Sequence, residues 1–291
     1  MCFMKKHNYV DEYLQWKGTY APKACINYGL WIRRFFAQCD KELEDVTVED
    51  VVKFLGWLKG KYQPKSIELA MVIIHNFLDF WKNAGVRCMS PNMVKLPKAK
   101  ANSHQPIKED EYHRLLLAIN VQDFRSLQKS VIVRMLFDTG VRISELCDLN
   151  ISDIETGKCS TTIQTKKTNK QRMIFWSMET DIFLIQYLKE RNQINSTNAL
   201  LIGHLSDGTP TRRLTPRSVE RMIKKLCDAA GIGKRITPHS FRHGKAHRVL
   251  ELGGNPKDVQ AILGHANPAS SFTYLQWNDQ EFETRAKKFL T

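Results

Sequence analysis

The feature that most constrains the fold is a series of closely spaced helix caps near the C-terminus. Thr237, followed by proline, is typical of a helix start, because its hydroxyl caps free amide groups and proline fits the first helical turn. A glycine pair from Gly253 would end that helix, and Asn255, again followed by proline, would begin a second one that ends at Gly264. Helices that begin and end so abruptly hold side chains at defined points, so we expect a site in this stretch.

Four side chains suited to phosphate chemistry occur here. His239 and Arg242 lie in the first predicted helix, His265 directly follows the glycine that ends the second, and Tyr274 lies in a third short helix that begins at Asn267. An arginine matches two oxygens of a phosphate group, and a tyrosine can act as a nucleophile when cations favour its ionised form. The set therefore indicates a phosphate diester as substrate.

The charge of the chain agrees with a nucleic-acid partner. The sequence has 44 lysines and arginines against 30 aspartates and glutamates, a net charge of +14. Such an excess attracts polyanions, of which nucleic acid is the commonest. On composition alone, a basic protein with no such partner is the alternative.

The cysteines and the apolar pattern predict a soluble, cytoplasmic protein. Seven cysteines are scattered without a paired motif, which is typical of free thiols in a reducing compartment. No apolar run approaches the roughly 18 residues of a membrane span, and the first residues do not lead into a signal-type segment. We expect an intracellular protein that associates with the nucleoid and not with a membrane.

An apolar content of 42% is sufficient for a buried core, and the length of 291 residues predicts about two domains. Residues 1–84 show helical periodicity only, with one apolar stripe over Ile26, Leu30, Ile32 and Phe36. Thr47, with an acidic residue three positions later, predicts a capping box at the start of another helix. We expect a helical DNA-binding domain in this region.

Residues 85–106 predict a linker. Helical periodicity fails there, and prolines alternate with basic residues, a pattern typical of a stiff, extended segment. We expect this basic linker to contact DNA through Lys95, Lys98 and Lys100.

Residues 107–291 predict a mostly helical domain with a small antiparallel sheet, so the fold class is mainly α. The expected helices begin at Glu109, end near Gly140, resume at Ser144, and cover 181–191 and 216–230; the strand-like runs are 151–154, 160–165 and 172–176. Arg142 would lie in the tight turn between two of these helices. The cationic segment KKTNKQ would form the tip of a hairpin between the last two strands.

Several motifs in this domain resemble those of the tyrosine recombinases, or phage-type integrases. They are FDTGVRISELCDL, KKTNKQR, HSFRH, and LGH with Tyr274 nine residues after His265, all in the order of that family over about 109–275. The helical region before them resembles the family's core-binding domain by pattern alone. The family fold implied is a C-shaped clamp around duplex DNA.

The resemblance implies which residues act on the DNA. The catalytic set would be Arg142, Lys167, His239, Arg242 and His265, with Tyr274 as the nucleophile. Glu145, one turn beyond Arg142, would orient that arginine, and Lys166, Lys170 and Arg172 of the cationic hairpin would contact DNA. Two departures stand out: Gly244 and Lys245 replace a small hydroxyl residue and an aromatic, and Lys166 replaces a common glycine, which leaves the choice between Lys166 and Lys167 open.

The implied chemistry uses no metal or other cofactor, because arginines replace the metal charge at the phosphate. Lys167 would protonate the departing 5′ oxygen, and His239 would take the proton of the tyrosine. His239, His243 and His247, at four-residue spacing, could instead bind zinc. Ser240, however, stands where a zinc protease helix carries its glutamate, so we expect no metal site.

The expected function is site-specific recombination by a DNA strand transferase, in integration, excision or resolution, through a 3′-phosphotyrosyl intermediate. A homo-tetramer on two inverted-repeat sites is implied, with residues 276–291 forming a helix that docks on a neighbouring protomer or, alternatively, folds back on its own domain. Two rival functions keep the fold: relaxation of DNA in the manner of a type IB topoisomerase, and regulation by a non-catalytic DNA-binding protein.

Overall fold

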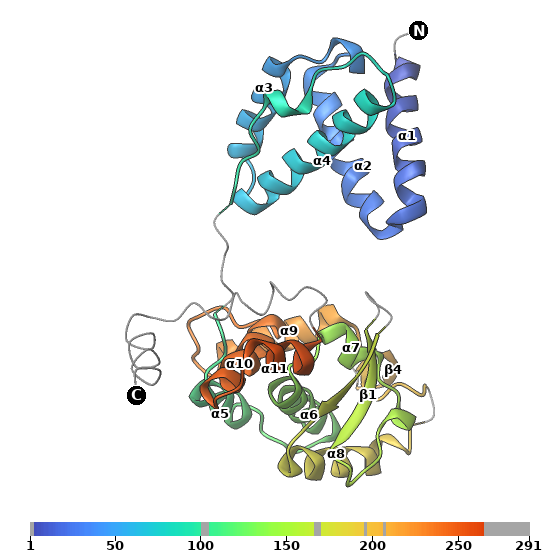
Figure 1. The fold of residues 1–291 in the computed structure, drawn as a ribbon. Helices are drawn as coiled ribbons and strands as arrows, with labels where there is room; N and C mark the ends of the chain where they lie inside the picture. The colour runs from blue at the N-terminus through green and yellow to red at the C-terminus, as the bar shows by residue number, and fades with distance from the viewer. Residues whose placement is uncertain (1–2, 100–104, 166–169, 195–196, 206–207, 265–291) are drawn as a thin grey trace, which may run out of the picture. The chain divides into compact units, whose positions relative to one another are not determined.

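The computed structural model describes residues 3–99, 105–165, 170–194, 197–205 and 208–264, and it divides the chain at about residue 102 into two units (Figure 1). Each unit has its own hydrophobic core. The six cysteines within the described ranges are free thiols, as predicted. No helix in these ranges is both long enough and apolar enough to cross a bilayer.

The N-terminal unit is helical, as predicted. Its elements are α1 (Phe3–Tyr20), α2 (Pro22–Cys39), η1 (Leu43–Asp45), α3 (Val48–Lys59), α4 (Pro64–Asn83) and η2 (Pro91–Met93). The predicted capping box begins α3: the backbone amide of Thr47 donates to Asp50 Oδ2 at 2.9 Å. The core lies between the helices and is rich in aromatic rings, including Phe35, Phe54 and Phe77.

The buried face of α2 differs from the predicted stripe. Ile26 is 80% exposed and Leu30 is 42% exposed, whereas Trp31 and Phe35 are buried together with Ile32 and Phe36. The helix carries apolar residues on more than one side, so periodicity alone does not select the face. The side with three large aromatic rings is the one that enters the core, since it removes more apolar surface from water.

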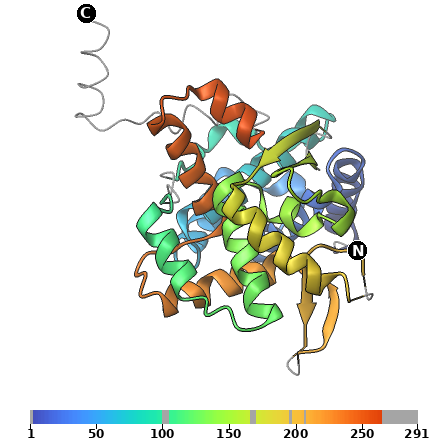
Figure 2. The ribbon, with the colours of Figure 1, turned by 90° about the horizontal axis from the view of Figure 1, so that it is seen from below.

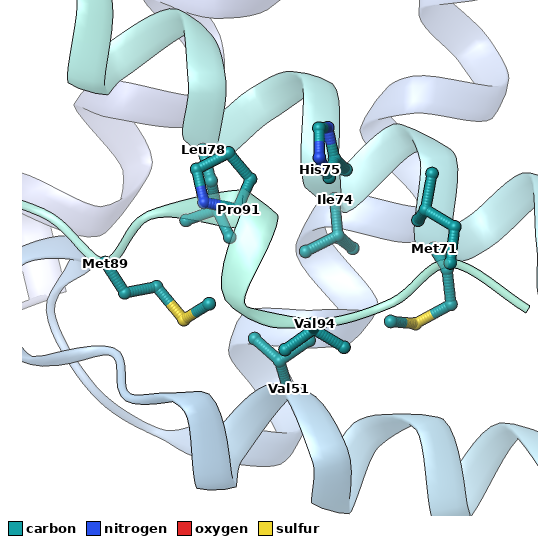
Figure 3. A pocket seen from close by; sticks show the side chains of 9 residues that line it. Val51, Met71, Ile74, His75, Leu78, Met89, Pro91 and Val94 are labelled. Carbon is teal, nitrogen blue, oxygen red and sulfur yellow. The ribbon is translucent and has the colours of Figure 1, made fainter.

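Much of the segment predicted as a linker packs on the N-terminal unit. Figure 3 shows Pro91 and Val94 beside Ile74 and Leu78 of α4, around a small cavity. The Ala99 backbone amide then donates to a glutamate of α4 at 3.4 Å. The unit therefore continues beyond the predicted boundary at residue 84, because the apolar residues between the prolines and lysines pack against the core of this unit.

The C-terminal unit is mostly helical with small antiparallel sheets. Its elements are α5 (Glu109–Leu117), α6 (Phe124–Thr139), α7 (Ile143–Asp148), η3 (Ile151–Asp153), β1 (Ser160–Thr165), β2 (Lys170–Phe175), α8 (Met178–Arg191), β3 (Ile202–His204), β4 (Pro210–Arg213), α9 (Pro216–Ala229), α10 (Pro238–Glu251) and α11 (Pro256–Leu263). Helix α6 is buried on nearly all sides and forms the centre of the core. Helices α10 and α11 lie side by side, and α10 packs on α6 (Figures 1 and 2).

Two features of this unit depart from the sequence prediction. Residues 151–154 were expected as a strand, but 151–153 form the turn η3, because the Asn150 amide donates to Asp153 Oδ2 at 2.7 Å and so bends the backbone. The pair β3–β4 was missed, since a strand of three residues is too short to show alternation. The predicted hairpin is confirmed: β1 and β2 pair with Ile163 opposite Arg172 and Thr165 opposite Lys170.

Gly244 has a structural reason on α10. The backbone amide of Ile107 donates to the Ser240 carbonyl at 3.0 Å, which brings the chain before α5 against the helix. A Cβ atom at position 244 would lie 2.7 Å from the Ile107 carbonyl oxygen, so the close approach requires glycine. The departure at Gly244 is therefore accommodated by packing within this unit.

Candidate active site

The turn between α6 and α7 places Arg142. Helix α6 ends at Gly140 with φ of +60°, and a Cβ atom there would lie 2.7 Å from Leu263 of α11, so only glycine fits this position. Arg142 then caps α7: its backbone amide donates to Glu145 Oε2 at 3.0 Å. The arginine is thus held at both its backbone and its side chain, because Nη1 also donates to Glu145 Oε1 at 2.8 Å.

Arg242 connects the ends of two helices. It lies on α10, is 5% exposed, and donates from Nη1 to the Gly140 carbonyl at 3.0 Å and from Nη2 to the Leu263 carbonyl. A planar guanidinium can reach two such acceptors at once, which a lysine ammonium cannot do in the same geometry. Arg242 therefore fixes the end of α6 relative to the end of α11.

Arg172 was predicted to contact DNA, whereas its side chain is largely buried in the structure. Its side chain on β2 is 9% exposed and donates to Glu145 Oε2 from Nη2 at 3.0 Å and from Nη1 at 3.3 Å. Its Nε reaches the Ile262 carbonyl at 3.4 Å. The guanidinium is therefore directed into the protein, where a buried carboxylate lies within reach.

Three arginines thus meet at the C-terminal end of α11. Arg172, Arg242 and Arg142 donate to the carbonyls of residues 262, 263 and 264, respectively. The last carbonyls of a helix have no partners within the helix and carry partial negative charge, so cations are favoured there. The chain leaves α11 at Gly264, in the left-handed conformation with φ of +65°, from a point fixed by three other elements.

The remaining predicted residues fall into three groups. His239 is exposed in the first turn of α10, three residues before Arg242 on the same helix. Lys95 and Lys98 are exposed on the N-terminal unit. The residues outside the described ranges are Lys100, Lys166, Lys167, His265 and Tyr274, together with the predicted helix of residues 276–291; Lys170 is placed by its backbone on β2 only.

The three histidines of the zinc alternative lie on α10. His239, His243 and His247 follow one another at four-residue spacing on that helix. Among the residues that the structure describes, no group of three or more histidine, cysteine, aspartate or glutamate side chains is arranged to hold a metal ion.

A basic groove in the C-terminal unit was not anticipated from the sequence. It has a volume of about 700 Å³ and lies between α6, the β3–β4 pair and α9. Its lining includes six cations and no carboxylate: Arg125, Lys129, Arg212, Arg213, Arg221 and Lys225. Arg213 is used structurally, because its Nη1 donates to the carbonyls of Cys147 at 2.9 Å and Leu149 at 2.8 Å. The cations come from three separate segments, so no continuous basic stretch in the sequence indicates the groove. The adjacent pair Arg212 and Arg213 is the strongest local indication of it.

His204 lines the same groove but adds no charge to it. Burial lowers the pKa of His204, and the nearby Arg125 lowers it further, against the opposing effect of Asp123. The imidazole therefore remains neutral where a free histidine would begin to take up a proton. The positive charge of the groove comes from its arginines and lysines.

Comparison with known proteins identifies the family of this chain. Residues 105–281 match the model of the phage integrase family. Tyrosine recombinase XerC of Anoxybacillus flavithermus is 27% identical over 92% of this chain and 91% of its own length, and tyrosine recombinase XerA of Pyrococcus furiosus is 30% identical over 79% of this chain and 76% of its own length. A crystal structure of XerA recombinase, 27% identical, has a TM-score of 0.54 over 97% of this chain and 98% of that one.

The Tn1549 transposon integrase, solved in complex with a circular intermediate DNA, has a TM-score of 0.78 at 16% identity over 99% of each chain, which shows a common fold. The match of the family model over more than half of the chain and the XerA relative together establish the family. The chain belongs to the phage integrase family and is a tyrosine recombinase, an enzyme that recombines DNA at specific sites.

Proposed function

We propose that this recombinase cleaves DNA with Tyr274 as the nucleophile. The phenolate oxygen would form a bond to the scissile phosphorus while the bond from phosphorus to the 5′ oxygen breaks. The products are a 3′-phosphotyrosyl link and a free 5′ hydroxyl. A 5′ hydroxyl from a second strand would reverse the step and release the tyrosine. Since each broken bond is replaced by a similar one, rejoining needs no ATP.

The observation that carries this proposal is the meeting of Arg142 and Arg242 at the end of α11, immediately before His265 in the chain. A phosphate under attack gains charge on its non-bridging oxygens, and cations fixed in advance stabilise that charge. Arginine stays charged at any working pH. Arg142, with 29% of its side chain exposed, is the better placed of the two to touch the phosphate, and Arg242 adds a fixed charge from within the unit.

Proton transfer requires two further groups. Free tyrosine has a pKa of about 10, so it needs nearby cations and a base in order to attack at neutral pH. We assign the base to His239, which is exposed near the start of α10, and the acid that protonates the departing 5′ oxygen to Lys167, which lies in the sequence between β1 and β2. His265 would donate a hydrogen bond to the phosphate.

Both units would contact one DNA duplex. In this proposal the C-terminal unit is the catalytic unit, and its basic groove offers five cations besides Arg213 to the phosphate backbone. The exposed Lys95 and Lys98, with Lys100, would add contacts from the N-terminal unit, and Lys166 and Lys170 would add contacts from the hairpin. We further propose that the enzyme acts in the cytoplasm at the nucleoid, where its DNA substrate would lie.

Strand exchange between two sites requires four nucleophiles, so we further propose a homo-tetramer on two inverted-repeat sites. A lambda integrase tetramer solved on a Holliday junction shares the fold of this chain, with a TM-score of 0.72 at 19% identity. Residues 276–291 would link neighbouring protomers. Selection of bound sequences from a random duplex pool tests the site: an inverted repeat around a spacer is expected, whereas binding without sequence preference would favour simple relaxation of DNA.

The nucleophile is tested on a nicked duplex that traps the covalent intermediate. Wild-type protein should form an adduct that survives denaturation, and Tyr274→Phe should bind the duplex with similar affinity and form no adduct. An adduct of undiminished yield in Tyr274→Phe would remove Tyr274 from this role. Mapping the linked peptide by mass spectrometry would then identify the residue that replaces it.

A further inference from the structure

Arg172 occupies a position between the cationic site and the end of α11. Its guanidinium contacts Glu145, which also binds Arg142, and its Nε contacts the Ile262 carbonyl. The fit is close: a Cβ atom at Gly264 would lie 2.7 Å from the Arg172 Cδ and 2.9 Å from its Nε. Gly264 is thus needed for two reasons, the left-handed backbone and the space that Arg172 occupies.

A direct contact between Arg172 and a DNA phosphate does not fit this geometry. Only 9% of the side chain is exposed, and its donors already have acceptors within the protein. Burial lowers the pKa of Arg172 and the nearby Arg142 lowers it further, whereas Glu145 raises it. Two guanidiniums that repel each other are therefore held together by one carboxylate between them.

The two carboxylate oxygens of Glu145 accept hydrogen bonds from Arg142 and Arg172. Oε1 accepts from Arg142 Nη1 at 2.8 Å, and Oε2 accepts from the Arg142 backbone amide at 3.0 Å and from Arg172 at 3.0 Å. The Glu145 side chain is 3% exposed, so water cannot replace a lost partner. Without Arg172, Arg142 would be the one cation among the described residues that is paired with this buried carboxylate, and the carboxylate would draw that guanidinium toward itself.

We propose that Arg172 is a positioning residue for the cleavage step, which acts by holding Glu145 and the end of α11 so that Arg142 stays directed at the DNA phosphate. The proposal rests on the proposed function of Arg142. Arg172 offsets the charge of Glu145, so the Arg142–Glu145–Arg172 group keeps one net positive charge for the substrate. It also ties β2, which carries the cationic hairpin, to the helix that precedes His265.

The first test separates DNA binding from cleavage. In Arg172→Met, DNA affinity and its salt dependence should stay within about twofold of wild type, because no phosphate contact is lost. The rate of adduct formation at saturating DNA should fall on the order of 10²-fold, the effect of misplacing a reacting group by about 1 Å. Arg172→Lys should recover part of the rate by restoring the charge next to Glu145.

Gln171→Met is the matched control, since residue 171 is the exposed neighbour on the same strand. Its adduct formation should equal that of wild type. If Arg172→Met folds poorly, as judged from its melting temperature, Arg172→Lys alone carries the test. A loss of DNA affinity that matches the loss of rate, with a shallower salt dependence, would show a direct phosphate contact and overturn the proposal.

The second test is a double-mutant cycle with Glu145→Gln. If Arg172 acts through Glu145, the double variant should form adduct about as slowly as the slower single variant. Independent roles would instead multiply the two losses, and that outcome would also overturn the proposal. Wild-type adduct formation is measured alongside: its absence would refute the proposed function itself, whereas a normal wild-type rate with an unaffected Arg172→Met rate refutes only the role of Arg172.

Discussion

The two units of this recombinase are stabilised by different kinds of contact. The N-terminal unit has an apolar interior rich in aromatic rings, in which Tyr13 packs edge to face on Phe77 with ring centroids 5.2 Å apart. The catalytic unit also buries charged side chains, among them Arg191, Asp181 and Arg242. Apolar packing has little directional preference, whereas a buried charge needs acceptors at defined positions. A site that must hold cations in place is thus built from the second kind of contact.

Arg191 illustrates the directional contacts of the catalytic unit outside the site. It is fully buried at the end of α8, and it donates from Nη1 to the Ile194 carbonyl at 2.6 Å and from Nε to the Ala199 carbonyl at 3.1 Å. These contacts hold the chain between α8 and β3. Arg242 does the same for α6 and α11, so the use of arginine to bind backbone carbonyls is general in this unit.

The largest expected effect comes from Arg242→Lys, which keeps the positive charge but removes the planar guanidinium that donates to two acceptors. Lysine cannot reach the Gly140 and Leu263 carbonyls together, so we expect the rate of adduct formation to fall about 10²- to 10³-fold. Single-turnover cleavage of the nicked duplex measures it. Arg248→Lys, the same change on the same helix, serves as the control and should cleave normally. Equal rates for the two variants would mean that directional contacts at α11 are not required.

Arg191→Met tests whether directional contacts also decide the stability of the catalytic unit. The change leaves several buried carbonyls without donors, and we expect the free energy of unfolding of that unit to fall by about 3 kcal/mol or more. Calorimetry, with the transitions assigned to the two units, measures it. Arg33→Met, which removes a half-exposed arginine paired with Asp11 in the N-terminal unit, should cost less than about 1 kcal/mol. A small loss in the free energy of unfolding for both variants would show that the two units do not differ in their dependence on directional contacts.

Phe77→Leu should have a smaller effect than Arg191→Met, because an aromatic core tolerates a change of shape if most of the volume is kept. Phe77 is fully buried against Tyr13 and Phe36. We expect a loss of about 1 kcal/mol in the free energy of unfolding of the N-terminal unit, with cleavage by the folded protein unchanged. Chemical denaturation followed by tryptophan fluorescence measures it. A loss as large as that of Arg191→Met would show that this core is equally specific in its packing.

The parts of the structure that the sequence predicted depend on local chemistry. The caps at Thr47, Thr237 and Asn255 and the stop at Gly264 all lie where predicted, because each depends on neighbours within a few residues. The contact between Arg142 and Glu145 was predicted for the same reason, since Glu145 lies one turn beyond Arg142, the N-cap residue of α7. The roles in cleavage stay predictions for all six residues: Arg142, Lys167, His239, Arg242, His265 and Tyr274.

The contacts that the sequence could not predict join residues far apart in the chain. The acceptor of Arg172 at Ile262 is 90 positions away, and that of Arg242 at Gly140 is 102 positions away. Every residue has a backbone carbonyl, so nothing in the sequence marks the one that an arginine will bind. The cationic hairpin suggested a surface role for Arg172, but strand alternation and a buried carboxylate turn this one side chain inward.

The end of α11 should differ from most helix ends in how it exchanges its amide hydrogens with solvent. The last turn of a helix normally frays, which makes its amides exchange within the fastest class. Here the carbonyls of residues 262–264 bind guanidiniums from β2, α10 and α7. If this helix end frayed, three buried or half-buried arginines would lose their backbone acceptors at the same time. We therefore expect opening at this point to require loosening of β2, α10 and the turn before α7, so that the amides at this end of α11 exchange about as slowly as those of the core.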